Sequence, residues 1–405
     1  MTTVRAQDFL RSGVSARVGV LGGGQLGRML ALAGIPLGIR FRFLDPDPDS
    51  PAKDAGELIV APYTDEDALR RFAQDLDAIT YEFENVPASV AAYLASHCPV
   101  VFPPARALEV CQDRLLEKQL FKKVGLDTPR FAAVNSASEL RESIASTIGT
   151  PCVLKTRRMG YDGKGQAVIR DLAQAEEAFA RVGGSAPSPS LIVESFVPFL
   201  RELSLICVRG APGSPEPRTR FYPLVENHHA GGVLRRSIAP ATGVPASLQS
   251  RAERLAQRLL DEMDYVGVLT IELFETEDKD EGGLATLLGN EMAPRVHNSG
   301  HWTIEGSATS QFENHLRAVL GWPTGSTLMR EGLPHAAMLN LLRAPLPHPA
   351  DGGEPPVWMH THLYAKGHRD PAQERKVGHV TIVSPSASAL GARLDHARKS
   401  LGLND

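Results

Sequence analysis

The chain has 405 residues, of which 42% are hydrophobic and 22% charged, and its formal net charge is −4. At roughly 150 residues per domain, this length predicts two or three globular domains and excludes a single small module. The slightly acidic balance, without a basic block, is unlike that of a protein that binds nucleic acid or an anionic membrane. No apolar run reaches the roughly 18 residues of a membrane span, and Arg5, Asp8 and Arg11 leave no apolar core for a signal peptide.

The N-terminal segment alternates between short apolar strands and helices. Strands are expected at Arg17–Leu21, Phe41–Leu44, Leu58–Ala61, Ala78–Phe83 and Pro99–Phe102, and helices at Gln25–Ala33, Glu66–Gln74 and Ala88–His97. This βαβ rhythm is typical of an open parallel sheet, whose ligands bind at the carboxyl ends of the strands. We therefore expect an α/β, Rossmann-like domain over residues 1–112.

A smaller unit is expected over residues 113–194. Pro103 and Pro104 end the first rhythm, and Ala105–Val124 reads as one long charged helix. Then follow a strand at Cys152–Lys155, a glycine-rich turn, a helix at Leu172–Val182 and a linker-like stretch at Gly183–Ser190.

From Leu191 onward the pattern becomes rich in strands separated by acidic or Pro/Gly turns. Strands are expected at Leu203–Val208, Thr219–Leu224, Val268–Phe274 and Leu284–Met292, with a helix at Pro245–Met263, a connector at Arg343–Pro356 and short strands in the tail. This order favours a mixed or antiparallel sheet, and so an α+β domain over residues 195–405.

The four cysteines, Cys98, Cys111, Cys152 and Cys207, are scattered without a CxxC pair. Such spacing is typical of reduced, buried thiols rather than of a zinc site or disulfides. We therefore expect a cytoplasmic protein.

Gly22, Gly24 and Gly27 fit the pattern G-x-G-x-x-G after the first strand, and Asp45 ends the second. Glycines at this spacing allow a phosphate to approach a helix N-terminus, and the added acid completes a dinucleotide fingerprint. An NAD-dependent oxidoreductase is therefore one hypothesis. The alternative is that the turn only packs a helix on a sheet or binds another phosphate.

Lys155 ends an apolar strand just before a loop with glycines at 160, 163 and 165. A cation and free backbone amides in this order suit a polyphosphate, although the loop is not a P-loop. The alternative is a surface hairpin with an exposed lysine.

Glu272 and Glu291 lie on two expected strands that flank an acidic turn. If the residue numbers of cross-strand partners add up to 563, the turn centres on Glu281–Gly282 and Glu272 faces Glu291. Two like charges in that position repel each other unless a cation lies between them. Their hard oxygens suit Mg²⁺ on nucleotide phosphates. The alternative is a register shifted by one residue, with one glutamate solvated.

Arg295, His297 and Asn298 follow Glu291 closely and could bind an anion beside the metal pair. Upstream, Glu194 ends a strand and begins a hinge whose backbone could pair with an adenine edge, and Glu202 could accept from ribose hydroxyls.

Taken together, these motifs resemble those of the ATP-grasp ligases, and within them the 5-(carboxyamino)imidazole ribonucleotide synthetases of purine biosynthesis. The similar segments are GGGQLGRML (Gly22–Leu30), EFENV (Glu82–Val86), YDGKGQ (Tyr161–Gln166) and EMAPRVHNSGHWT (Glu291–Thr303). The resemblance spans most of the chain, from Val18 to Val380. It implies an N-terminal Rossmann-like domain, a small central lid and a C-terminal domain with a mixed or antiparallel sheet.

The resemblance also implies a reaction. ATP would phosphorylate bicarbonate to carboxyphosphate, which would carboxylate the amine of aminoimidazole ribonucleotide and leave ADP and phosphate. The implied cofactors are ATP and Mg²⁺, or Mn²⁺ in its place, and the implied assembly is a homodimer in the cytoplasm. Carboxyphosphate is short-lived, so a glycine-hinged loop that excludes water fits this chemistry.

Residue roles follow from the matching motifs. The ATP site would comprise Arg114, Lys155, Gly160, Tyr161, Asp162, Gly163, Lys164, Gly165, Gln166, Glu194, Ser195, Phe196, Val197, Glu202, His229, Asn290 and Glu291. The metal would be held by Glu272 and Glu291. The catalytic set would comprise Tyr161, Asp162, Arg295, His297 and Asn298, with the last three on bicarbonate. The ribonucleotide would be bound by Gln25, Leu26, Glu82, Glu84, Lys366, Arg375 and Lys376.

The chain departs from the family pattern at two places. Ala293 stands where many ATP-grasp enzymes have asparagine, so the metal has one fewer protein ligand or borrows Asn298. Asp370–Glu374 replaces a shorter Arg-Pro-Gly segment, which affects the expected phosphate contacts.

Besides the oxidoreductase, two other hypotheses are a catalytically silent nucleotide-binding protein of this fold and a related ligase that uses formate or another acyl donor. The intact glutamate pair argues against the first of these two, and the Arg295–Asn298 run against the second.

Overall fold

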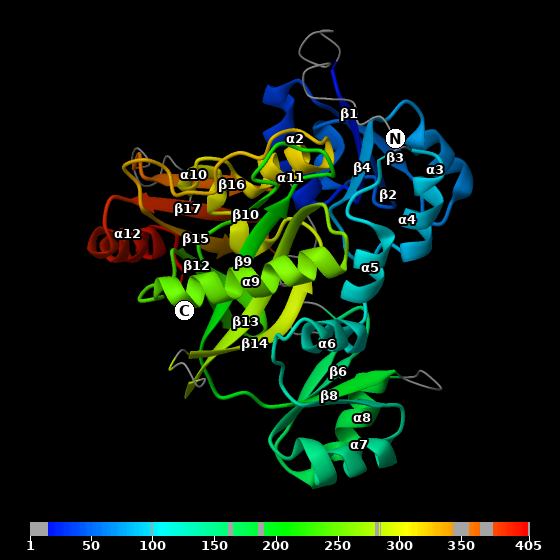
Figure 1. Ribbon diagram of the computed structural model, residues 1–405, viewed down its shortest axis with the longest axis vertical. Helices are drawn as coiled ribbons and strands as arrows, with labels where there is room; N and C mark the ends of the chain where they lie inside the picture. Colours follow the sequence, from blue (N-terminus) through cyan, green and yellow to red (C-terminus); the bar gives the residue numbers. More distant parts are fainter. Residues whose placement is uncertain are drawn as a thin grey trace.

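The computed structural model describes residues 15–98, 100–160, 165–184, 190–279, 283, 285–342, 356–364 and 376–403. These residues form three β-sheets with helices packed on them, and a small unit lies at one end of a larger body (Figure 1). Throughout these ranges, no helix is both long and apolar enough to span a bilayer.

The N-terminal unit is a parallel sheet with strand order β3-β2-β1-β4, as predicted. It contains β1 (Arg17–Leu21), β2 (Arg40–Asp45), β3 (Glu57–Val60), β4 (Ala78–Tyr81), α2 (Gln25–Gly34), α3 (Glu66–Ala73) and α4 (Ala88–Ala95), with 3₁₀ turns at Ile35–Leu37 and Pro51–Asp54. Val18 and Val20 pack with α2 on one face, whereas Leu21 and Ile79 pack with α3 and α4 on the other. The two central strands, β1 and β4, are buried almost throughout because both of their faces are covered.

The predicted fifth strand is wrong. Val101 makes only an isolated parallel bridge to Ile79, whose backbone exchanges hydrogen bonds with Val100 and Phe102. Pro103 follows directly and has no N–H to donate, so the pairing ends there.

The predicted single helix over Ala105–Val124 is also wrong, because the chain forms α5 (Ala105–Cys111) and α6 (Arg114–Lys123). Asp113 separates them in an extended conformation, and its carboxylate accepts a hydrogen bond from the Leu115 amide at 3.0 Å. The same carboxylate receives two hydrogen bonds from Arg157, at 2.9 and 2.6 Å. Asp113 is thus the N-cap of α6, held in place by Arg157, and a second helix begins there although the charged segment continues.

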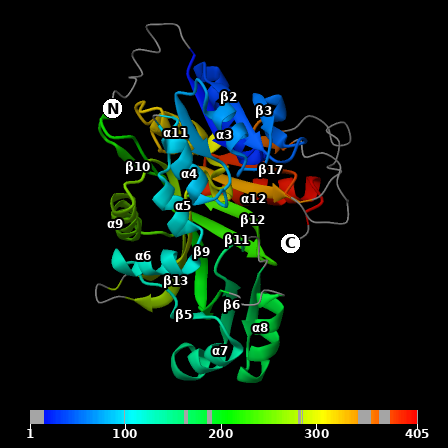
Figure 2. The ribbon, with the colours of Figure 1, turned by 90° about the vertical axis from the view of Figure 1, so that its right-hand side faces the viewer.

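The small unit is an antiparallel sheet of order β5-β8-β6-β7. It contains β5 (Phe131–Val134), α7 (Ala137–Ser143), a π turn (Ile144–Ile148), β6 (Cys152–Thr156), β7 (Gln166–Ile169), a 3₁₀ turn (Leu172–Gln174), α8 (Ala175–Gly183) and β8 (Leu191–Ser195). Helices α7 and α8 pack together on this sheet, at the lower end of the molecule in Figure 2.

The C-terminal unit is a nine-stranded sheet of order β14-β13-β9-β11-β12-β15-β17-β16, with β10 paired to β9. Its strands are β9 (Phe199–Arg209), β10 (Thr219–Phe221), β11 (Val225–Ala230), β12 (Val233–Ala239), β13 (Gly267–Lys279), β14 (Ala285–Ala293), β15 (His335–Leu341), β16 (Met359–Leu363) and β17 (Gly378–Ser384). Its helices are α9 (Ala246–Glu262), α10 (Thr303–Gly306), α11 (Gln311–Val319) and α12 (Ala387–Ser400), with a 3₁₀ turn, η5, at Asn298–Gly300. The strand pairs are antiparallel, as the sequence predicts.

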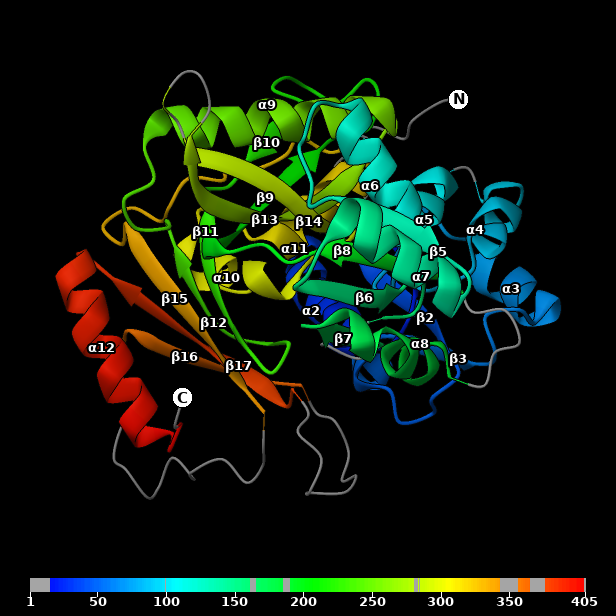
Figure 3. The same ribbon diagram turned by 90° about the horizontal axis from the view of Figure 1, so that it is seen from below.

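This large sheet is covered on both faces (Figure 3). Leu205 and Leu269 pack with α9 and α6 on one face. Ile206 and Val268 pack with α11 and with α2 of the N-terminal unit on the other. Alternate residues of β9 and β13 therefore belong to two different hydrophobic cores, one on each face of the sheet. Through these cores the C-terminal sheet packs against both the N-terminal unit and α6.

Candidate active site

The site centres on the paired carboxylates of Glu272 on β13 and Glu291 on β14, which are direct cross-strand partners. The register that sums to 563 is therefore confirmed at this pair. It shifts just beyond, between Glu272 and Leu273, where Leu273 faces Gly289 and Asn290 is the extra residue of a β-bulge. Burial, and then the neighbouring Glu291, raise the pKa of Glu272 to about 7.

Helix α6 holds the strand that carries Glu291. Arg114 donates from Nη1 to Glu291 Oε2 at 2.8 Å, and although burial opposes it, this guanidinium lowers the pKa of Glu291 to about 2. One turn further, Glu117 accepts from the Met292 amide at 2.6 Å, and Lys118 donates to the carbonyls of Gly289 at 3.1 Å and Asn290 at 2.6 Å. Positions i, i+3 and i+4 share one helix face, so a single turn of α6 fixes the bulge.

Two lysines share the carboxylate of Glu194 at the end of β8. Its Oε2 lies 3.0 Å from Lys155 Nζ and 3.4 Å from Lys118 Nζ. Despite complete burial, the two ammonium groups lower the pKa of Glu194 to about 2. The small sheet therefore meets α6, which packs on the C-terminal sheet, through a charged contact at the edge of the site.

A cleft of about 340 Å³ lies between the two units. Its walls include Arg114, Lys155, Gln166, Glu194, Ser195, Phe196, Val197, Glu202, His229, Glu272, Asn290, Glu291, His297, Asn298 and Lys376. The structure thus brings together, from both units, fifteen residues that the sequence had indicated as site residues. Phe199 and Phe274, stacked with ring centroids 4.8 Å apart, also line it.

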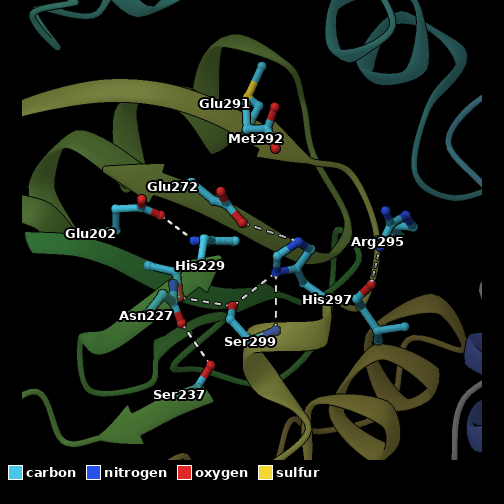
Figure 4. A network of polar contacts seen from close by, with 12 residues as sticks. Glu202, Asn227, His229, Ser237, Glu272, Glu291, Met292, Arg295, His297 and Ser299 are labelled. Carbon is cyan, nitrogen blue, oxygen red and sulfur yellow. Dashed lines mark hydrogen bonds and ion pairs between the residues drawn. The ribbon is translucent and has the colours of Figure 1, made fainter. Parts of the chain in front are cut away.

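His229 forms an ion pair with Glu202 within the cleft (Figure 4). Burial opposes the charged form, but Glu202 and the nearby Glu272 raise the pKa of His229. The cleft therefore places a cationic group beside the carboxylates.

His297 and Asn298 follow β14 and face the same cleft. His297 Nε2 lies 3.3 Å from Glu272 Oε1, and burial together with Arg295 lowers the pKa of His297 to about 3. Both amide atoms of Asn298, and Oδ1 of Asn290, are buried without a hydrogen-bond partner in the described structure. Buried unpaired amides in a cleft are poised for a polar ligand.

Arg295 turns toward the N-terminal unit, where its Nε pairs with Glu84, and Nη1 donates to the Val296 carbonyl at 2.9 Å. Burial raises the pKa of Glu84, but Arg295 outweighs it, so the net shift is downward. This contact joins a residue expected on bicarbonate to one expected on the ribonucleotide.

The glycine-rich turn holds a carboxylate that belongs to the chain. Glu82 accepts from the amides of Gly24 at 2.9 Å and of Leu26 and Gly27 at 3.1 Å. A Cβ on Gly24 would lie 2.6 Å from Glu82 Oε1. The expectation that a phosphate approaches this turn is therefore corrected, because Glu82 already occupies the anion position at the helix N-terminus.

Family models match nearly the whole chain. A Ribonucleotide synthetase preATP-grasp domain matches residues 15–112, an ATP-grasp domain residues 119–312, and a Phosphoribosylaminoimidazole carboxylase C-terminal domain residues 336–393. The N5-carboxyaminoimidazole ribonucleotide synthase of Pseudomonas aeruginosa is 48% identical over 385 residues, which cover 93% of this chain and 97% of that protein. The chain belongs to the N5-carboxyaminoimidazole ribonucleotide synthase family. A family member from Bacillus subtilis is 38% identical and covers 91% of each chain.

Solved structures of this family share the fold. The enzyme from Thermus thermophilus is 48% identical, has a TM-score of 0.84, and covers 96% of this chain and 99% of its own. The enzyme from Aspergillus clavatus, in complex with ADP and 5-aminoimidazole ribonucleotide, is 29% identical, has a TM-score of 0.82 and covers 96% and 99%. The predicted ATP-grasp fold is confirmed.

Several predicted positions lie outside the described residues. They are Tyr161, Asp162, Gly163, Lys164, Lys366, Arg375, the turn at Glu281–Gly282, the Asp370–Glu374 segment, and most of Gly183–Ser190 and Arg343–Pro356. Of the same loop, Gly160 is described, and its carbonyl accepts from Arg114 Nη2 at 3.5 Å. Gly165 has a φ of 71°, and its carbonyl accepts from the Thr156 amide at 2.8 Å.

Sequence reasoning missed Glu117, Lys118, Phe199 and Phe274. The two charged residues sit in a helix whose charge pattern predicts a solvated face, yet they are 1% and 0% exposed. The two phenylalanines look like ordinary strand residues. Only the position of Phe274 on β13, two residues after Glu272 and so on the same strand face, could have indicated a wall of the site.

Proposed function

We propose that this chain catalyses the ATP-dependent carboxylation of 5-aminoimidazole ribonucleotide, in line with its relatives that are named N5-carboxyaminoimidazole ribonucleotide synthase. ATP phosphorylates bicarbonate to carboxyphosphate, which carboxylates the amine and releases phosphate. The products are N5-carboxyaminoimidazole ribonucleotide, ADP and phosphate. The observation that carries this proposal is that Glu272, Glu291, Lys155, His297 and Asn298 all line one cleft.

The nucleotide would occupy the side of the cleft that lies against the small unit. Lys155 and Arg114 offer cations to its phosphates, and the unpaired Oδ1 of Asn290 faces the same space. The backbone of Glu194–Val197 would meet adenine, and Glu202 with His229 would meet the ribose. The residues at 160–166 would cover the phosphates.

The residues present fit Mg²⁺. Two carboxylates are opposed across a ladder, burial and mutual repulsion raise the pKa of one of them, and an asparagine with unpaired amide atoms lies beside them. Hard oxygen donors of this kind are those that Mg²⁺ prefers, and Mn²⁺ accepts them too. When bound, the ion supplies positive charge at the phosphate oxygens of ATP. Ala293 contributes no ligand atom at its side chain, so Asn298 is the candidate third donor.

Arg295, His297 and Asn298 would orient bicarbonate and carboxyphosphate. The ribonucleotide would bind along Gln25, Leu26, Glu82, Glu84 and Lys376, together with Tyr161, Asp162, Lys366 and Arg375. Glu82 contributes by holding the turn that presents Gln25, since its two oxygens are engaged by backbone amides. The Arg295–Glu84 pair links the two substrate regions.

The division into domains at 1–112, 113–194 and 195–405 is part of this proposal, with boundaries at the α5–α6 break and near the end of β8. The homodimer, the cytoplasmic location and the exclusion of nucleic acid and membrane partners stay predictions.

The deciding assay measures ADP release while aminoimidazole ribonucleotide and bicarbonate are omitted in turn. We expect full release only with both substrates present. Equal ADP release without the ribonucleotide would mean either that the assigned acceptor is wrong or that ATP cleavage is only loosely coupled to carboxylation.

A Glu291→Gln variant tests the metal pair. We expect turnover to be abolished with the folded structure intact, whereas Glu277→Gln, an exposed glutamate on the same β13–β14 hairpin, should retain wild-type activity. Near-normal turnover by Glu291→Gln would rule out the assigned metal role.

A further inference from the structure

A row of polar side chains crosses the C-terminal sheet beneath the cleft. Ser204 on β9 is the cross-strand partner of Glu272, and Asn227 on β11 is the partner of Ser237 on β12. Ser204, Ser237 and Ser299 are fully buried, and Asn227 is 7% exposed. Buried polar groups are costly unless they are hydrogen-bonded, so their contacts carry information.

These side chains form a continuous chain of hydrogen bonds that ends at His297 (Figure 4). Ser237 Oγ lies 2.8 Å from Asn227 Oδ1, and Asn227 Nδ2 lies 3.0 Å from Ser204 Oγ. Ser204 Oγ lies 2.9 Å from Ser299 Oγ, which is 2.9 Å from His297 Nδ1.

The direction of this chain follows from one backbone amide. The Ser299 N–H donates to His297 Nδ1 at 3.3 Å, so Nδ1 accepts and carries no hydrogen. The Ser299 hydroxyl must therefore also donate to Nδ1, and Ser204 must donate to Ser299. Asn227 must then present its NH₂ to Ser204 and its oxygen to Ser237, because each hydroxyl has one hydrogen to give.

The protonation of the other ring nitrogen of His297, Nε2, follows from this. With Nδ1 as acceptor, the ring hydrogen lies on Nε2, which faces Glu272 Oε1 at 3.3 Å. The other charged or titratable groups near the ring are Glu291, Arg295, His229, His301 and Lys376. None of these replaces the Ser299 donors at Nδ1.

We propose that Ser204, Asn227 and Ser237 are positioning residues that, through Ser299, hold His297 in the tautomer with hydrogen on Nε2. His297 then serves bicarbonate or carboxyphosphate as a hydrogen-bond donor. It is not a base, because an Nε2 that bears hydrogen has no lone pair with which to take a proton. This role rests on the proposed function, but the tautomer itself does not.

The first test reads the tautomer directly, without substrates. Histidine-selective ¹⁵N labelling and ¹H–¹⁵N correlation spectra of the full chain should show His297 with an unprotonated Nδ1, the resonances being assigned by their loss in His297→Gln. Ser299→Ala removes the hydroxyl donor and keeps the backbone amide donor, so we expect Nδ1 to stay unprotonated and its resonance to shift as it loses one of its two hydrogen bonds. Hydrogen on Nδ1 in the wild type would overturn the proposal, whatever the enzyme's activity.

The second test separates this role from simple stability. Ser204→Ala removes a hydroxyl that lies outside the cleft lining, and we expect KM for bicarbonate to rise roughly 3- to 10-fold, the worth of about one net hydrogen bond, with KM for ATP unchanged.

The matched control is Ser307→Ala, which removes a buried hydroxyl that donates to the Leu328 carbonyl at 3.1 Å. We expect this variant to keep wild-type KM values. A Ser204→Ala enzyme with wild-type KM for bicarbonate and an unchanged His297 spectrum would refute the relay. If wild-type ADP release did not depend on bicarbonate, the proposed function would fail while the spectra still decided the tautomer.

Discussion

Lys118 is a buried cation that no substrate motif includes, and its removal tests whether α6 holds the metal strand. The side chain is fully buried and donates to the carbonyls of Gly289 and Asn290. Its ammonium also lies 3.4 Å from Glu194. Lys118→Met keeps a similar apolar length and removes only the charge and the donors.

The magnitude follows from these three contacts. Two buried carbonyls lose their donor, at about 1–3 kcal/mol each. Glu194 keeps Lys155, so it is not left unpaired. Burial lowers the pKa of Lys118, which means that the buried charge itself is unfavourable, and its removal offsets part of the loss. We therefore expect the free energy of unfolding to fall by about 2–4 kcal/mol. We also expect kcat to fall, because the bulge that orients Glu291 loses its support.

Urea unfolding followed by tryptophan fluorescence, with kcat measured on the same samples, provides the assay. Lys123→Met on the same helix is the matched control, since Lys123 pairs with Glu262 at the surface and its side chain is 62% exposed. We expect that control to change stability by less than about 1 kcal/mol. If Lys118→Met matched the control in both stability and kcat, the reasoning about α6 would be refuted.

Three further predictions concern stability and pH. Gly391→Ala in α12, where an added Cβ meets nothing within 4 Å, should raise the free energy of unfolding by about 0.5–1 kcal/mol in urea titrations; a decrease would contradict the open environment. Gly24→Ala should lower it by about 1–3 kcal/mol through the clash with Glu82, and an unchanged midpoint would contradict the close approach. Burial lowers the pKa of His315 from 6.5 to about 4. Its contribution is therefore fully present above pH 6.5 and is lost as the pH falls toward 4, because only the unfolded chain binds the proton. Between pH 6 and 4.5, the free energy of unfolding should fall less steeply with pH in His315→Gln than in the wild type, the two slopes differing by about 1.4 kcal/mol per pH unit. Equal slopes in the two proteins would contradict this prediction.

The local sequence pattern was sufficient to predict the two larger sheets and the central glutamate pair of the site. Alternation of strands and helices predicted the parallel N-terminal sheet, and strand-rich spacing predicted the antiparallel C-terminal one. The pairing of Glu272 with Glu291 was found by counting from an acidic turn, because an antiparallel hairpin links sequence distance to register. The specific motif at Glu291–Thr303 was sufficient to indicate the family.

Only the tertiary structure decided what lies behind these motifs. Asp113 divides a charged segment into two helices by binding Arg157. Glu82, which directly follows β4, fills the glycine turn from more than fifty residues further along the chain. Glu117 and Lys118 are buried against β14, and the Ser204–Asn227–Ser237 row runs beneath the cleft. None of these contacts has a local signature, because a polar residue is buried only where a distant segment satisfies its hydrogen bonds, and the fold alone brings that segment near.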